Sequence, residues 1–124
     1  MPADEPAGQT DGPTSPGGHS RAHLDVTVAS DGPAIAVTLR GELDEATAPI
    51  LVSELGAAVE PGRDLVVDLG GLGFCGSAGL SALILVERRV SDAGGALRLT
   101  DPNPFLVELL EMAGMDRLLA APEG

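Results

Sequence analysis

The short run Leu65–Leu69 limits the possible folds of this chain more than any other segment. It reads Leu-Val-Val-Asp-Leu and is followed directly by glycines. Such a short and nearly continuous apolar run is typical of a central strand that is covered on both faces. A chain that contains this strand must also supply the helices that cover it.

The segments around this run alternate between strand and helix patterns. Two alternating apolar runs, 24–28 and 35–39, flank the turn residues 30–33 and predict a hairpin. Apolar residues at helical spacing predict a helix over 50–59, another that starts near Ser77, and a third between Asn103 and Gly114. With a further strand at 96–100, we predict a small single-domain α/β fold. Its mixed sheet of four or five strands is packed with helices in the order β-β-α-β-α-β-α.

The first 22 residues differ in composition from the rest. They hold four Pro and four Gly but no Val, Ile, Leu or Phe. A segment with so little apolar surface cannot offset the entropy that ordering costs. We therefore predict a disordered tail over 1–22 and one folded domain over 23–124.

The charge of the chain restricts its partners. The net charge is −12 and all seven basic residues are Arg. We expect no binding to nucleic acid or to a membrane, because both surfaces are anionic. The charge suits either a basic protein partner or solubility alone. The acidic start lacks an apolar signal region and no apolar run is long enough to span a bilayer, so we expect a cytoplasmic protein.

Few residues are available for catalysis or metal binding. Cys75 is the single cysteine, and His19 and His23 have no paired ligands at a suitable spacing. Cys75 has no neighbouring base, so we interpret it as a small buried apolar residue. We predict no metal, no cofactor and no enzymatic activity.

The glycine-rich segment 70–76 predicts a loop between the strand 65–69 and the next helix, and this loop has three interpretations. Gly71-x-Gly73-x-x-Gly76 matches a dinucleotide-binding fingerprint, but the chain is too short for the usual doubly wound sheet. A phosphate-binding loop would need Lys where Ser77 stands. In the third interpretation, Ser77 lies at the N-cap of the following helix, where the helix dipole would stabilise a covalent phosphate. Serine is also a favoured N-cap without any further function.

A resemblance to a known family favours the third interpretation. From about His23 to Leu119 the chain resembles the STAS domain of anti-sigma factor antagonists. The matching segments occur in the family's order and spacing; they are Gly41-Glu42-Leu43-Asp44, the strand 65–69 with its Asp68-Leu69, Phe74-Cys75-Gly76-Ser77-Ala78-Gly79-Leu80, and 109–115. The family loop reads Phe-x-Asp-Ser-Ser-Gly-Leu and carries the phosphorylated residue as its first serine.

This resemblance implies a site and a set of partners. Ser77 is the implied phosphoacceptor, and Asp44 is the acid expected close to it. The implied switch segment that contacts the partner comprises Asp44, Cys75, Gly76, Ser77, Ala78 and Gly79. The sequence departs from the family at Gly76, which replaces the acid, and at Ala78, which replaces the second serine.

The implied function is partner switching in bacterial transcription and stress response. The unphosphorylated protein binds an anti-sigma factor of the serine kinase type and releases a sigma factor. Phosphorylation of Ser77 ends this binding, and a phosphatase restores it. The sequence does not determine the oligomeric state, and we favour a monomer. Because of Gly76, a STAS scaffold that is never phosphorylated remains an alternative. A small nucleotide-binding protein that uses Gly71, Gly73 and Gly76 is a second alternative.

Overall fold

The computed structural model describes residues 23–30 and 32–119, and the tail predicted over 1–22 lies outside this range. The elements follow the predicted order, and the sheet has four strands. The strands are β1 (Leu24–Ala29), β2 (Ile35–Leu43), β3 (Leu65–Cys75) and β4 (Leu97–Thr100). The helices are α1 (Ala48–Ala58), α2 (Ser77–Asp92) and α3 (Pro104–Met112), followed by the short 3₁₀ helix η1 (Asp116–Leu118).

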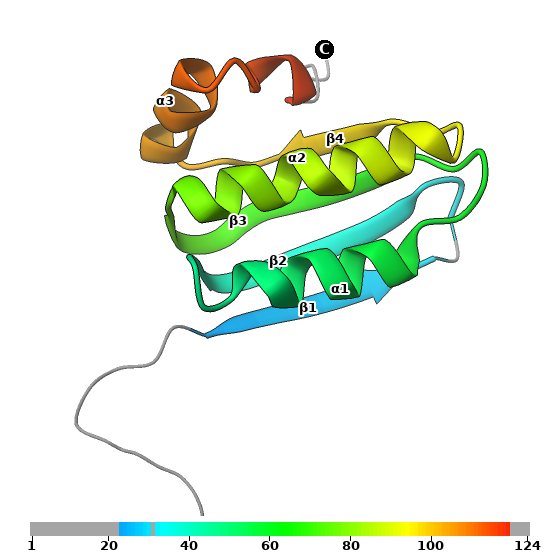
Figure 1. Cartoon of the computed structure of the whole chain (residues 1–124), viewed down its shortest axis with the longest axis horizontal. Coiled ribbons are helices and arrows are strands. Elements are labelled where there is room, and N and C mark those ends of the chain that lie inside the picture. Colours follow the sequence, from blue (N-terminus) through cyan, green and yellow to red (C-terminus); the bar gives the residue numbers. More distant parts are fainter. Residues whose placement is uncertain (1–22, 31, 120–124) are drawn as a thin grey trace, which may run out of the picture.

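The four strands lie in the order in which they occur along the chain. β1 and β2 form the predicted antiparallel hairpin, whereas β2 pairs with β3 and β3 with β4 in parallel. The two parallel connections contain α1 and α2, and both advance in the same direction across the sheet. Right-handed crossovers that advance in one direction place their helices on the same face. Figure 1 shows α1 and α2 side by side over one face of the sheet.

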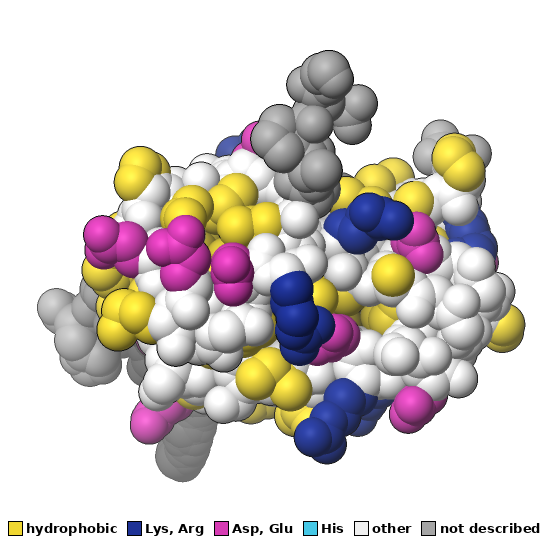
Figure 2. Space-filling view, turned by 90° about the horizontal axis from the view of Figure 1, so that it is seen from above, with side chains coloured by type: hydrophobic (Ala, Val, Ile, Leu, Met, Phe, Trp, Pro, Cys, Tyr) yellow, Lys and Arg dark blue, Asp and Glu magenta, His cyan; other side chains and the backbone are white. Residues whose placement is uncertain are grey.

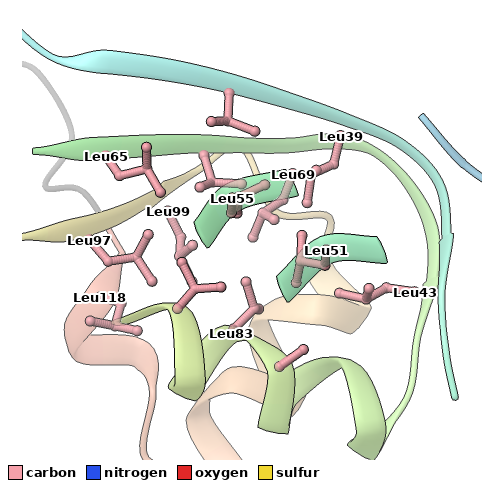
Figure 3. Packing of buried hydrophobic residues seen from close by; sticks show 14 of the residues in the cluster. Leu39, Leu43, Leu51, Leu55, Leu65, Leu69, Leu83, Leu97, Leu99 and Leu118 are labelled. Atoms are coloured by element: carbon pink, nitrogen blue, oxygen red, sulfur yellow. The ribbon is translucent and has the colours of Figure 1, made fainter. Parts of the chain in front are cut away.

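The core lies between these two helices and the sheet. Figure 3 shows leucines of β2, β3 and β4 pointing toward leucines of α1 and α2. Leu51 and Leu55 of α1 and Leu83 of α2 are fully buried there. In the part of the chain that the structure describes, no helix covers the other face of the sheet in this way. Val66 and Asp68 of β3 are accordingly only half-buried there. The expectation that this strand is covered on both faces is therefore wrong, and the common direction of the two crossovers is the reason.

The glycine-rich segment is a strand and not the expected loop. β3 continues to Cys75 and pairs with β2 through two register shifts. A side chain at Gly71 would come within 2.6 Å of the Leu39 carbonyl oxygen, so only glycine lets the two backbones pass this closely. The glycines here serve strand pairing.

Helix α3 begins after the predicted cap residue Asn103 and ends before the predicted terminator Gly114. The Asn103 side chain accepts a hydrogen bond from the Leu106 N–H at 2.8 Å, and Gly114, with φ of 73°, follows the end of α3. The chain then returns to the sheet, where Met115 and Leu118 are buried and Leu119 pairs with Leu99. α3 itself lies beyond the β4 edge of the sheet (Figure 1).

Candidate functional site

Ser77 is the first residue of α2, and its side chain is exposed. The N-cap is Gly76, so the expectation that the Ser77 hydroxyl caps this helix is wrong. The Gly76 N–H donates to the Leu43 carbonyl at 3.0 Å. Its own carbonyl accepts from the N–H groups of Gly79 and Leu80 at 3.0 and 3.1 Å. The backbone of Gly76 thus completes the strand and opens the helix, which leaves the serine hydroxyl to solvent.

The position of Ser77 suits a negative charge. The N–H groups of Ser77 and Ala78 have no carbonyl one turn earlier within the helix, as at any helix start. They lie at the positive end of the dipole of a 16-residue helix. A phosphate on the exposed hydroxyl would therefore be stabilised locally and would remain accessible to a kinase or a phosphatase.

The strand register brings Asp44 to the same edge of the sheet. Leu43 pairs with Cys75, so the residues that follow each strand, Asp44 and Gly76, are neighbours. Asp44 is half-buried, and its Oδ1 accepts from the N–H groups of Ala46 and Thr47 at 2.9 and 3.1 Å. Asp44 therefore shapes the turn into α1, and its backbone lies next to Gly76, which opens α2.

Thr47 holds this turn in place, a role that the sequence patterns did not predict. It is the N-cap residue of α1 and is 1% exposed. Its Oγ1 donates to the Glu42 carbonyl at 2.8 Å and accepts from the Asp44 N–H at 3.0 Å. A buried hydroxyl satisfied on both sides fixes the end of β2 relative to α1.

Two residues of the implied switch segment are buried. A side chain on Gly79 would come within 2.6 Å of Leu43 Cγ and 3.1 Å of Cys75 Sγ, so glycine lets α2 approach the sheet at this point. Cys75 is 4% exposed, and burial raises the pKa of its thiol to about 11. The thiol is protonated at neutral pH, which agrees with the interpretation of Cys75 as a packing residue.

The surface around Ser77 comprises Gly76, Ala78 and Phe74. Gly76 and Ala78 are half-buried, whereas Phe74 is 49% exposed. A side chain at Gly76 would lie 3.4 Å from the Phe74 ring, which is an ordinary contact. The sequence pattern did not place Phe74 at the surface, because segment 70–76 was expected to form a loop and not the end of β3.

Other kinds of site find little support in this geometry. Gly71 and Gly73 lie within β3, so they do not form the loop that a dinucleotide fingerprint requires. Within residues 23–30 and 32–119, no three His, Cys, Asp or Glu residues gather in a way that could hold a metal ion. In the same part of the chain, no helix combines the length and the apolar character that a membrane crossing needs.

Comparison with known proteins places this chain in one family. The family model described as Mlab, STAS domain, matches residues 26–120. The chain therefore belongs to the STAS domain family. BtrV of Bordetella bronchiseptica, a proposed anti-sigma factor antagonist, is 39% identical over 85 residues, which cover 68% of this chain and 72% of BtrV.

Solved structures agree with this assignment. The chain resembles an anti-sigma factor antagonist from Mycobacterium paratuberculosis with a TM-score of 0.68 and 27% identity, covering 78% of this chain and 83% of that one. The Bacillus protein SpoIIAA in its phosphorylated form has the same fold, with a TM-score of 0.62 and 18% identity over 80% of this chain and 93% of its own. Anti-sigma factor antagonists are regulators without enzymatic activity.

Proposed function

We propose that this protein is an anti-sigma factor antagonist that binds an anti-sigma factor of the serine kinase type, and that phosphorylation of Ser77 ends this binding. The single observation that carries the proposal is the exposed hydroxyl at the start of α2, within a segment that resembles the family's phosphorylation loop. The relatives named as anti-sigma factor antagonists support the partner class.

The chemistry of the site supports a switch that acts through charge. A phosphate adds a charge of about −1.5 to −2 at neutral pH. Here it would stand beside Asp44 and Glu45 on a chain whose net charge is already −12. Seating a partner over such a group requires its desolvation, which weakens the complex. A phosphatase that removes the phosphate would restore binding.

The test is the intact mass of the purified protein after incubation with ATP and each candidate anti-sigma kinase of the source organism. We expect one added phosphate on the wild type and none on Ser77→Ala. The matched control is Ser81→Ala, because Ser81 is an exposed serine one turn further along α2. Phosphate on Ser77→Ala but not on Ser81→Ala would contradict the assignment of Ser77.

A second candidate function is favoured by Gly76. The family's acid would stand directly before the phosphoacceptor, and here that position carries no side chain. If no kinase adds phosphate to the wild type, while an anti-sigma factor still binds it, the protein is a STAS interaction module without a phosphorylation switch.

A further inference from the structure

An apolar groove lies on the outer side of the seam between α1 and α2. Its volume is about 610 Å³, within the range of about 300–1,000 Å³ that is usual for binding pockets. Ala48, Pro49 and Val52 line it from α1, and Ala78, Ala82 and Leu85 line it from α2. Each set recurs at helical spacing, so one continuous stripe of each helix forms one wall.

Leu85 of α2 lines this groove and is 47% exposed, which is unusual for a large apolar side chain on a helix that packs against a sheet. The side seen from above in Figure 2 shows small groups of hydrophobic side chains between charged ones, which is usual for a protein surface. An exposed apolar groove with a polar rim is a more specific mark of an interaction site.

The groove begins at the proposed switch. Ala78 and Ser81, which line it, follow Ser77 by one and four residues on the same helix. A phosphate on Ser77 would lie at this end of the groove, and a partner that binds there would have to desolvate it at a cost in free energy. The groove and the switch therefore act on the same occupant.

The groove carries one charge of each sign. Glu45, just before α1, lines it, and so does Arg89 of α2, whose guanidinium lies against Gly56 of α1. An occupant of complementary charge is apolar along its length and carries an acidic residue near Arg89, away from Glu45. The exposure of Leu85 shows that the groove is open to solvent along this wall. A bound acyl chain would therefore remain partly in contact with water, whereas a protein surface can cover the whole groove.

We propose that the groove between α1 and α2 receives the apolar face of an amphipathic helix of the anti-sigma partner, with an acidic residue of that helix near Arg89. The inference rests on the proposed function, because it names the surface that this partner contacts. Helix-in-groove recognition uses apolar anchors one turn apart, which matches the spacing of both walls.

The test compares two adjacent substitutions on α2. Leu85→Asp places a charge in the groove. Ile84→Asp places the same charge at the preceding residue, which is also exposed and of similar size but does not line the groove. Both proteins should fold, which circular dichroism checks. In calorimetric titration with each anti-sigma factor of the source organism, we expect Leu85→Asp to weaken binding by at least about tenfold and Ile84→Asp by less than about twofold.

The outcomes separate the two proposals. If the wild type binds no anti-sigma factor, the proposed function is wrong and the groove proposal falls with it. If the wild type binds and Leu85→Asp binds equally well, the function stands and the groove proposal is wrong. Equal losses for both variants also overturn it. A wild-type dimer in sedimentation velocity that Leu85→Asp dissociates would assign the groove to a second copy of the chain, against our proposal.

Discussion

Gly76 is the residue at which this chain departs most clearly from the family pattern, and the structure leaves room to reverse that departure. An added side chain would make only an ordinary contact with the Phe74 ring, and the backbone at Gly76, with φ of −103°, suits any residue. We expect Gly76→Asp to remain folded, because Asp is also a favoured N-cap. We also expect faster phosphate transfer to Ser77, because the carboxylate can hydrogen-bond the hydroxyl.

Intact mass over time, with the cognate kinase and ATP, measures this rate. Gly73→Asp is the matched control, because it adds the same charge to an open position of β3 that is not adjacent to the hydroxyl. An equal or slower rate in Gly76→Asp than in the wild type would show that the missing acid does not limit the reaction.

Gly79 is a packing residue, and its replacement should destabilise the fold. The new methyl group of Gly79→Ala would collide with Leu43, which is fully buried and cannot move aside. Overpacking of this kind costs about 1–3 kcal/mol, which exceeds the gain in helix propensity of about 1 kcal/mol. Urea unfolding should therefore give a lower midpoint for Gly79→Ala than for the wild type. Gly73→Ala, with no atom closer than 3.9 Å, should be nearly neutral, and equal effects would contradict the packing role.

Sequence patterns predicted some features of Ser77 and Asp44 but not others. Ser77 was found from its place before a helix, but its hydroxyl is free because the Gly76 backbone takes the capping position. That outcome depends on a hydrogen bond to Leu43, 33 residues earlier, and local spacing does not report such a contact. The proximity of Asp44 to this site came only from the family resemblance, because it follows from the pairing of β2 with β3.

Among the elements, the predicted order was right and the lengths of two strands were not. β2 and β3 extend through glycine-containing segments that local propensity assigns to loops. Gly41, with φ of 113°, and Gly71 are required where neighbouring strands approach closely, so tertiary pairing overrides the local signal there. The helical periodicity of apolar residues was sufficient to predict the three helices, because each helix carries an apolar stripe that faces the core.

A salt bridge ties the C-terminal segment to α2 and predicts a pH dependence. Arg117 donates to both carboxylate oxygens of Glu87, at 2.6 and 3.0 Å. This hydrogen bond lowers the pKa of Glu87 in the folded state below its ordinary value of 4.5. A depressed carboxylate pKa adds stability above the unfolded-state pKa, and this stability is lost as the pH falls through the folded-state value.

We therefore expect Glu87→Gln to lower the thermal midpoint at pH 7 and to lower it less at pH 3, because the carboxylate loses its charge as the pH falls through its folded-state pKa. The effect at pH 7 should be modest, because the pair lies at the surface. Thermal unfolding of both proteins at the two pH values measures this difference. Glu108→Gln, which changes an exposed glutamate on α3, is the control. A difference that persists unchanged at pH 3 would show that Glu87 acts through packing.

For the whole molecule, the arrangement of layers follows from chain direction and handedness. The apolar run 65–69 indicated a strand covered on both faces, but both crossovers advance the same way and place their helices together. A pattern of apolar residues shows that a strand is buried without showing which helix covers it. The same arrangement sets α1 beside α2 and so creates the groove that Ala78, the residue after Ser77, lines.

The charge of the whole molecule predicts that it does not bind nucleic acid. Affinity for DNA depends on cationic side chains that displace counterions from phosphates. Here acidic residues outnumber basic ones by 19 to 7. Arg63, Arg98 and Arg117 also form salt bridges with acidic neighbours. We expect micromolar protein to cause no mobility shift of duplex DNA at physiological salt, beside a basic DNA-binding protein as positive control. A shift that weakens as salt is added would reveal a cationic surface and would overturn this prediction.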